Sequence, residues 1–426
     1  METAELYSHF LQCSSLSTDT RKIAPGCLFV ALKGENFDAN TFAAEALAKG
    51  AKYVVIDNEG YLSDDRMLLV PDSLEALQQL ARHHRRELGL PVIALTGSNG
   101  KTTTKELINA VLLKKYSTTA TVGNLNNHIG VPLTLLSFTK DTEIGIVEMG
   151  ANHQKEIELL CSIAEPNFGY ITNFGKAHLE GFGGFEGVIK GKSELYAYLE
   201  SHTKMAFVNL DDPIQKEKTD KLPRFTFAKE GYNCDVRIEA VEAAPMVKLE
   251  YNGLDIRSHL IGMYNAANIS AAIAIGTYFR VSDVKIKAAI EGYIPSNNRS
   301  QLVEKNGNSI IMDAYNANPS SMGAAIANFG QLDGNKIAIL GDMFELGEES
   351  HEEHQKLVTL LAKEENIETY FVGKYFYANK TNDAHLHFFE SFDALKEYIM
   401  GKSFSNNIIL IKGSRGMALE RVLEVI

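Results

Sequence analysis

Apolar and polar positions alternate along most of this chain in a way that predicts strands separated by helices. Residues 92–95 form a short apolar run that is typical of a buried strand, and residues 105–115 have the spacing of a helix. The same succession recurs downstream, with strands expected at 144–149, 168–172 and 205–210 and helices at 153–164 and 186–199. Apolar strands that alternate with helices favour a doubly wound, mostly parallel sheet, which binds ligands at the carboxyl ends of its strands.

Two further alternating regions flank this central one. The N-terminal region predicts strands at 27–32, 52–56 and 67–70, and the region after a linker-like stretch at 295–299 predicts strands at 309–312, 336–340, 369–372 and 408–411. Between residues 236 and 261, alternating stretches surround Asn252 and Gly253, a pair that favours a β-hairpin. We therefore predict an α/β protein with three domains, namely a small N-terminal α/β module (1–88), a central domain of the phosphate-loop type (89–296) and a C-terminal Rossmann-like domain (297–426).

The strongest chemical signal follows the predicted strand at 92–95. Residues 96–106 read TGSNGKTTTKE, in which the glycines let backbone N–H groups face an anion, Lys101 adds a positive charge and Thr102 offers a hydroxyl to Mg²⁺. The pattern is shorter than the usual GxxxxGK[ST] loop, because Leu95 stands where the longer pattern has glycine. An ordinary glycine turn with a solvated lysine would fit the same letters, but a strand before it and a helix after it favour nucleotide phosphate binding.

Composition narrows the classes of partner. The 426 residues include 42 basic and 54 acidic side chains, and the net charge of −12 argues against general nucleic-acid binding and against an anionic membrane surface. The four cysteines have no metal-ligand spacing, which is typical of reduced thiols. The chain lacks a long apolar run and a basic N-terminal segment, so we expect a cytoplasmic protein without membrane insertion.

Several polar residues lie where the central strands are expected to end. Thr102 and Glu148 could hold Mg²⁺, which prefers oxygen ligands, although a glutamate at a strand end can also be a cap or an ion-pair partner. Lys192 could contact a phosphate, carry a solvated charge or become carbamylated by CO₂, and composition does not choose between these. His178 is a metal ligand or an ordinary core residue. Asn265 and Asn268 share a helix face and suit an adenine edge, but Asn265 could equally cap the helix.

The two outer regions carry polar groups of their own at strand ends. In the N-terminal region, Arg21 suits a phosphate, and Asn36 or Asn40 suits a uracil or a sugar, with capped turns as the equal alternative. In the C-terminal region, polar side chains at one expected edge suggest a second substrate, although some of them must be structural. These C-terminal residues are Asn316, Asn318, Asp342, Glu345 and the run Lys412-Gly413-Ser414-Arg415.

Taken together, these segments resemble the Mur ligase family over nearly the whole chain. TGSNGKTTTKE is similar to the family's ATP loop, AHLEGFG and KGKSELY to its metal and carbamyl-lysine segments, and GMYNAANISAA to its adenine segment. GNLNNHIGVPLTLL (123–136) and EMGAN (148–152) resemble two further family blocks. DAYNANPSSM, GDMFELG and KGSR favour the branch of the family that adds D-alanyl-D-alanine.

The resemblance implies a specific reaction. ATP would phosphorylate the terminal carboxylate of UDP-N-acetylmuramoyl-tripeptide, and the amine of D-alanyl-D-alanine would attack the acyl phosphate, in cytoplasmic peptidoglycan precursor synthesis by a monomer. The alternatives are a sister Mur-type or folylpolyglutamate-type amino-acid ligase or, in a different class, a regulatory nucleotide-binding ATPase.

The resemblance also implies roles for individual residues. Lys101, Lys192 and His178 would be catalytic. Two Mg²⁺ ions would be held by Thr102, Glu148, His178 and carbamylated Lys192. ATP would be bound by Gly97, Ser98, Asn99, Gly100, Lys101, Thr102, Thr103, Asn265, Asn268, Arg299 and Asp313. The two other substrates would be bound by Asp19, Arg21, Asn36, Asn40, Asn126, Asn127, Tyr315, Asn316, Asn318, Asp342 and Glu345. One departure from the family is Tyr264, which stands where relatives often have histidine.

Overall fold

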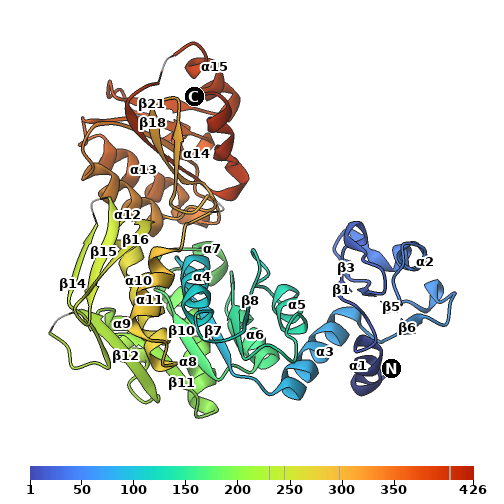
Figure 1. The fold of residues 1–426 in the computed structure, drawn as a ribbon. Helices are drawn as coiled ribbons and strands as arrows, with labels where there is room; N and C mark the ends of the chain where they lie inside the picture. Colours follow the sequence, from blue (N-terminus) through green and yellow to red (C-terminus); the bar gives the residue numbers. More distant parts are fainter. Residues whose placement is uncertain (230, 244, 297, 403) are drawn as a thin grey trace.

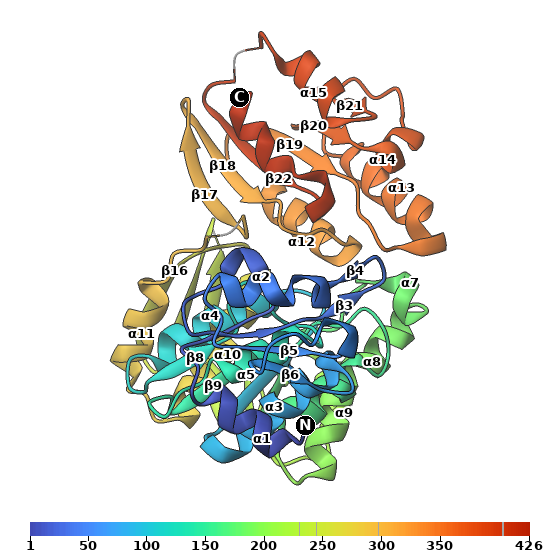
Figure 2. The ribbon, with the colours of Figure 1, turned by 90° about the vertical axis from the view of Figure 1, so that its right-hand side faces the viewer.

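The computed structural model describes residues 1–229, 231–243, 245–296, 298–402 and 404–426. Its three larger sheets lie in successive parts of the chain, which are arranged like an L with the middle part at the corner (Figure 1). In Figure 2 the N-terminal part faces the viewer, in front of the middle part. The predicted linker at 295–299 includes residue 297, which lies outside the described residues.

The middle sheet has seven strands in the order β13-β12-β11-β10-β7-β9-β8, and all its neighbouring strands pair in parallel. The predicted doubly wound, mostly parallel sheet is therefore confirmed. Its strands are β7 (Val92–Thr96), β8 (Thr118–Ala120), β9 (Ile144–Glu148), β10 (Phe168–Ile171), β11 (Met205–Asn209), β12 (Arg224–Lys229) and β13 (Val236–Ile238). The helices of this part are α4 (Lys101–Leu112), α5 (Gly130–Leu136), α6 (Glu156–Ala164), α7 (Leu179–Phe182), α8 (Phe185–Ser201), α9 (Pro213–Lys218), α10 (Tyr264–Tyr278) and α11 (Asp283–Glu291).

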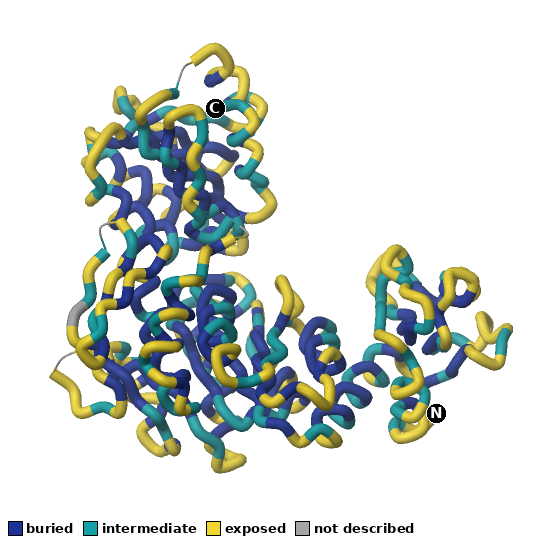
Figure 3. Tube along the Cα trace, in the orientation of Figure 1, coloured by how far each residue is buried: buried dark blue, intermediate teal, exposed yellow. Residues whose placement is uncertain are grey.

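The middle sheet is buried on both faces, which explains why its strands are continuously apolar. Along β7, Ile93 and Leu95 join the hydrophobic core that includes α4 and α10, whereas Val92 and Ala94 join the core that includes α6 and α8. Figure 3 shows this buried interior as a dark band through the corner of the L. No helix within the described ranges is both long and apolar enough to cross a membrane.

The predicted hairpin around Asn252 and Gly253 is confirmed. Strands β15 (Met246–Tyr251) and β16 (Leu254–Ile261) pair antiparallel, with β14 (Ala240–Ala243) on the other side of β15. Asn252 and Gly253 have φ angles of 49° and 69°, as a two-residue turn of type I′ requires. Residues 236–238, in contrast, extend the parallel middle sheet as β13.

The C-terminal sheet has six strands in the order β17-β18-β22-β19-β20-β21. Only β17 runs antiparallel to its neighbour among the described strand pairs of this sheet. Its strands are β17 (Gln301–Lys305), β18 (Asn308–Asp313), β19 (Asn335–Gly341), β20 (Ile367–Val372), β21 (Leu386–Phe389) and β22 (Asn407–Lys412). Its helices are α12 (Pro319–Gly330), α13 (Ser350–Leu361), α14 (Lys374–Ala378) and α15 (Phe392–Ile399).

The N-terminal sheet is joined to the middle part by the long helix α3 (Ser73–Leu88). The imidazole of His84 on α3 lies between the two parts, because Nδ1 contacts the Tyr7 hydroxyl at 3.2 Å and Nε2 contacts the Phe138 carbonyl at 2.9 Å. Arg85 donates to the carbonyls of Ala164 and Glu165 at the end of α6. The other elements of this part are α1 (Thr3–Phe10), α2 (Ala43–Ala48), β1 (Leu16–Ser17), β2 (Leu28–Val30), β3 (Lys33–Gly34), β4 (Phe37–Asp38), β5 (Tyr53–Ile56) and β6 (Met67–Leu69).

Candidate active site

A cavity of about 760 Å³ lies between the carboxyl edge of the middle sheet and the C-terminal domain. Its walls combine the loop after β7, the ends of β9 and β10, the start of α10 and the polar loop after β18. Seventeen of the residues that the sequence predicts as site residues line it. They are Ser98, Asn99, Gly100, Lys101, Thr102, Thr103, Asn126, Asn127, Glu148, His178, Asn265, Asn268, Arg299, Asp313, Tyr315, Asn316 and Asn318.

The glycine loop at 97–100 has a backbone that only glycine adopts easily at two positions. Gly97 has a φ of 139°, and a Cβ there would come within 2.0 Å of the Thr172 hydroxyl oxygen. Gly100 has a φ of 77°, and a Cβ there would come within 2.6 Å of Oδ1 of Asn268. The loop leads directly into α4, whose first residue is Lys101 and whose N-terminus has no side-chain cap. The backbone N–H groups of that first turn are therefore available to an anion in the cavity.

Lys101 is held inside this loop by two backbone carbonyls. Its Nζ donates to the Gly97 carbonyl at 2.7 Å and to the Ser98 carbonyl at 3.3 Å. Burial lowers the pKa of the Lys101 ammonium from its ordinary value. A phosphate beside it would supply the missing negative charge.

Glu148, at the end of β9, has one carboxylate oxygen engaged and the other free. Asn126 Nδ2 donates to Oε1 at 2.8 Å, whereas Oε2 is buried and has no hydrogen-bond partner. The whole residue is only 1% exposed. A buried carboxylate oxygen without a partner is costly, so this atom fits a cation in the cavity. Thr102, the other predicted ligand on this side, lies on the same wall of the cavity.

Lys192, on α8, is buried behind the cavity and is not part of its lining. Its Nζ donates to the Ala151 carbonyl at 2.9 Å, and Ala151 does line the cavity. Burial, followed by the nearby charge of Lys101, holds the pKa of the Lys192 amine well below its ordinary value. A neutral amine is the form that reacts with CO₂, so the chemistry of this side chain fits a carbamate. Lys190, two residues earlier in the KGKSELY segment, is exposed on the other side of α8.

The predicted metal set draws on more than acids and histidines. Across the described residues, no three His, Cys, Asp or Glu side chains gather as a ready-made metal site. A magnesium site at this edge would therefore use other oxygen donors beside Glu148, and the sequence predicts the Thr102 hydroxyl and a Lys192 carbamate for this role. Such hard oxygen donors are the type that Mg²⁺ prefers.

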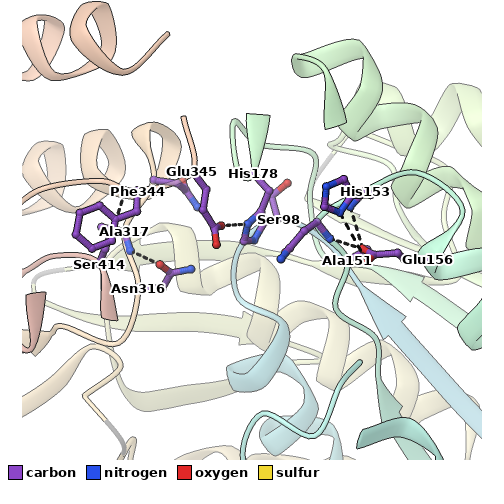
Figure 4. Close-up of polar contacts among 12 residues, drawn as sticks. Ser98, Ala151, His153, Glu156, His178, Asn316, Ala317, Phe344, Glu345 and Ser414 are labelled. Atoms are coloured by element: carbon purple, nitrogen blue, oxygen red, sulfur yellow. Dashed lines mark hydrogen bonds and ion pairs between the residues drawn. The ribbon is translucent and has the colours of Figure 1, made fainter. Parts of the chain in front are cut away.

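His178 contacts the C-terminal domain. Its Nδ1 pairs with Oε2 of Glu345, as Figure 4 shows between the two domains. Glu345 is absent from the cavity lining, although the sequence predicts it as a substrate contact. The structure thus brings together two residues for which the sequence predicts separate roles.

The asparagines of α10 form a chain that ends at the phosphate loop. Asn265 Nδ2 donates to the Ile261 carbonyl at 2.8 Å, and Asn268 Nδ2 donates to Oδ1 of Asn265 at 2.8 Å. The Thr104 hydroxyl then donates to Oδ1 of Asn268 at 3.0 Å. Both asparagines are buried yet line the cavity, so they share one face as predicted.

The loop after β18 connects the C-terminal domain to the phosphate loop. Asn318 caps α12 through a hydrogen bond from the Ser321 N–H, and its Nδ2 donates to Oδ1 of Asn99 at 2.7 Å. The Arg299 guanidinium stacks 3.6 Å from the centre of the Tyr315 ring. The cavity therefore has polar groups from both domains on facing walls.

Two predicted substrate contacts have no free polar atom to offer in the described structure. The Asn40 amide, 0% exposed, donates to Asp38 and Asp57 and accepts the Asp57 N–H. Asp342 accepts the N–H groups of Tyr375 and Phe376 and so caps α14. Both side chains stabilise local backbone, and their contact with a substrate stays a prediction.

The remaining N-terminal candidates lie away from this cavity. Asp19 and Arg21 form an exposed ion pair at 2.8 Å, and Asn36 is exposed in the turn between β3 and β4. None of the three lines the cavity. Figure 1 shows their domain on the far arm of the L.

The sequence interpretation placed Lys412 at a strand end but gave it no role of its own, and it missed Lys105. Lys412 lines the cavity and pairs with Asp313 at 2.6 Å, which follows from their equivalent positions on the adjacent strands β22 and β18. Lys105 is buried on α4 and donates to the Thr121 carbonyl at 2.7 Å, and the Thr121 hydroxyl accepts the Glu148 N–H. Lys105 thus holds the backbone beside Glu148. A lysine inside an otherwise apolar helix face was the available signal.

The fold and the site define a multidomain α/β protein with a phosphate loop that faces a second α/β domain. Sequence models of the Mur ligase family match three successive parts of the chain: the Mur ligase family catalytic domain at residues 12–85, the Mur ligase middle domain at 95–276 and the Mur ligase glutamate ligase domain at 298–415. The chain belongs to the Mur ligase family.

Individual relatives match nearly end to end. The UDP-N-acetylmuramoyl-tripeptide–D-alanyl-D-alanine ligase of Bacillus subtilis is 35% identical over 96% of this chain and 92% of its own. MurF from Acinetobacter baumannii has a TM-score of 0.87 at 32% identity, covering 99% of this chain and 97% of its own. MurF ligase from Thermotoga maritima, solved in complex with ADP, has a TM-score of 0.84 at 28% identity, covering 98% of this chain and 97% of its own.

Proposed function

We propose that this protein is an ATP-dependent ligase that joins D-alanyl-D-alanine to UDP-N-acetylmuramoyl-tripeptide and forms ADP. The observation that carries the proposal is the near-complete match, at 31–35% identity, to relatives that all bear the name of this ligase. The cavity supports it, because a phosphate loop faces the polar loop of the C-terminal domain across one space.

The phosphate loop would bind the ATP phosphates. The N–H groups at the start of α4 and the Lys101 ammonium would hold the phosphoryl oxygens, on which negative charge shifts during transfer. The terminal phosphoryl group passes to a carboxylate oxygen of the tripeptide and leaves ADP. The amine of the dipeptide then attacks the acyl carbon, and phosphate leaves as the amide forms. Asn265, Asn268, Arg299 and Asp313 would hold the base and ribose.

Two Mg²⁺ ions fit the donors that line or approach the cavity. Thr102 and Glu148 would hold one ion, and Glu148, His178 and carbamylated Lys192 the other. When bound, Mg²⁺ neutralises charge on the phosphoryl oxygens. The free Oε2 of Glu148 and the buried amine of Lys192 are the observations that support this set.

The other substrates would occupy opposite sides of the phosphate loop. Asn316 and Asn318 would receive the dipeptide, and Asp19, Arg21 and Asn36 the UDP end of the muramoyl substrate. This assignment corresponds to domains at 1–88, 89–296 and 297–426. From the resemblance to the family we infer that the enzyme works as a monomer, in the cytoplasm where ATP is available.

An acceptor screen tests this function. Phosphate release is measured with ATP, Mg²⁺ and UDP-N-acetylmuramoyl-tripeptide in the presence of D-alanyl-D-alanine, of single amino acids or of no amine. We expect release only with the dipeptide. Equal release with glutamate or another single amino acid would assign the chain to a sister ligase, and release without any amine would indicate a regulatory ATPase.

A further inference from the structure

The contact between His178 and Glu345 joins the two domains at the edge of the cavity. His178 begins α7 in the middle domain, and Glu345 lies in the turn after β19 in the C-terminal domain. Both have left-handed backbone conformations, with φ angles of 54° and 61°. A non-glycine residue in that region is unfavourable and persists where the surroundings hold it, often at functional sites. Here, both partners of one side-chain contact have this conformation.

The turn that carries Glu345 is fixed from within its own domain. The Met343 N–H donates to Nε2 of His354 at 3.0 Å, and the Phe344 N–H donates to the Ser414 hydroxyl at 3.0 Å. His354 is fully buried, and its Nδ1 lies 2.6 Å from the Ser350 carbonyl, so Nδ1 carries the proton and Nε2 accepts. Two backbone N–H groups therefore anchor the turn that carries Glu345, and Figure 4 shows the contact between Phe344 and Ser414.

The same turn also touches the segment that carries His178. The Glu180 N–H donates to the Glu345 carbonyl at 3.4 Å, and a Cβ on Gly347 would lie 3.1 Å from Cβ of Glu180. The two backbone segments therefore also contact each other next to the side-chain pair. His178 lines the cavity, whereas Glu345 does not. Glu345 thus contacts His178 at Nδ1 without lining the cavity itself.

We propose that Glu345 is a positioning residue that orients the His178 ring from the opposite domain. Nδ1–H of His178 donates to the Glu345 carboxylate, which turns Nε2 toward the groups that react in the cavity. The middle-domain site is then complete only when the C-terminal domain is docked. This inference rests on the proposed ligase function and gives Glu345 a different task from the dipeptide contact that the sequence predicts.

The first arm of the test measures the ring directly, without activity. Protein labelled with ¹⁵N-histidine and free of ligands is examined by NMR, and His178 is assigned by its loss in His178→Gln. We expect the wild-type ring to carry its proton on Nδ1. We expect Glu345→Ala to shift the population toward Nε2–H, and Glu345→Gln, which keeps an acceptor oxygen, to retain much of the Nδ1–H form. An unchanged tautomer in Glu345→Ala would overturn the proposal.

The second arm separates positioning from dipeptide binding. We expect Glu345→Ala to lower kcat by about 10- to 100-fold while the KM for D-alanyl-D-alanine stays close to the wild-type value. Glu345→Gln should recover part of kcat. Glu348→Ala, an exposed glutamate of the same turn, is the matched control and should behave as wild type. A raised KM for the dipeptide with unchanged kcat would show that Glu345 binds substrate instead.

The two experiments distinguish failure of the proposed function from failure of the positioning role. If the wild-type protein does not use D-alanyl-D-alanine at all, the proposed function falls, while the tautomer measurement still decides whether Glu345 orients His178. If the wild type is active and Glu345→Ala matches it in kcat, the positioning role falls and the ligase function stands.

Discussion

The carboxyl edges of the middle and C-terminal sheets carry similar charged residues in different states. At the middle edge, Oε2 of Glu148 is buried without a partner, and the Lys192 amine has one backbone carbonyl. At the C-terminal edge, both oxygens of Asp342 accept backbone N–H groups, and Asp313 pairs with Lys412. Residue type alone does not distinguish the two edges.

The difference is between side chains that have no partner within the chain and side chains that stabilise the local backbone. A buried polar group nearly always has a partner in a folded protein, so an unpaired one beside a cavity is a candidate for a partner from outside the chain. At the middle edge, Oε2 of Glu148 is such a group. At the C-terminal edge, Asp342 and Asp313 are paired within their own domain, and Glu345 is paired with His178 of the middle domain. The predictions below test this contrast by removing one group at a time.

The largest effect is expected at Lys192. Lys192→Ala removes the atom that would become a carbamate, so we expect activity to fall by about 1,000-fold. Short carboxylates such as acetate fit the space left by the side chain and should restore part of the rate. Steady-state phosphate release with and without added carboxylate measures both effects. Lys190→Ala, on the exposed side of the same helix, is the control. Wild-type rates in Lys192→Ala would remove the carbamate from the site.

Glu148→Gln is expected to lower activity without lowering the stability of the fold. The amide keeps an oxygen for Asn126 but removes the charge that a cation requires, so kcat/KM should fall on the order of 100-fold. Because a buried, unpaired carboxylate oxygen is costly, the melting temperature should stay or rise. Calorimetry and kinetics on the same preparation check this. A clear loss of stability would mean that the Glu148 charge has a structural partner, and the contrast between the edges would fail.

The fold was accessible from the sequence because its signals are local. Buried parallel strands are short apolar runs, the phosphate loop is a contiguous string between a strand and a helix, and the hairpin turn is set by Asn252 and Gly253. Even the position of Glu148 at the cavity follows from strand polarity, since the carboxyl ends of parallel strands meet at one edge.

The partners of individual polar residues were not accessible, because they come from distant parts of the chain. Asp342 accepts N–H groups at the start of α14, more than thirty residues further on, and no local pattern indicates these contacts. Glu345 and His178 are separated by 167 positions. Sequence identifies which side chains reach the edge of a sheet, but only the packed structure shows which of them are already paired.

Asp342→Asn tests whether Asp342 at the C-terminal edge stabilises the backbone at the start of α14. The amide keeps one acceptor but places an NH₂ group against an N–H donor of α14, so we expect a loss of about 1 kcal/mol in the stability of the C-terminal domain. The melting transition of that domain in calorimetry should move down, while kcat and KM stay close to wild type. Asp333→Asn, an exposed position of the same domain, is the control. A selective rise in the KM for the dipeptide would instead restore Asp342 as a substrate contact.

The smallest effect is expected at the ion pair between Lys176 and Glu353, which joins the two domains at 2.7 Å. Burial alone would raise the pKa of Glu353, but hydrogen bonds from Lys176 and Lys356 outweigh it, so the pKa lies below its ordinary value of 4.5. The pair therefore stabilises docking above about pH 4.5 and is lost as the pH falls through the lower folded-state pKa. Lys176 is 39% exposed at its side chain, so the contribution is about 0.5 kcal/mol.

Hydrogen exchange of residues 175–180 measures this contribution. Lys176→Met should increase exchange there by roughly twofold at pH 7, which corresponds to that free energy. In the wild type, the protection of residues 175–180 against exchange should fall between pH 6 and pH 4, after correction for intrinsic rates. This fall should be smaller in Lys176→Met. Lys356→Met removes a contact that lies entirely within α13 and should leave residues 175–180 unchanged. Equal effects of the two variants would mean that the interdomain pair does not hold the domains together, and that docking depends on the hydrogen bonds between Asn99 and Asn318 and between Lys176 and Ser320.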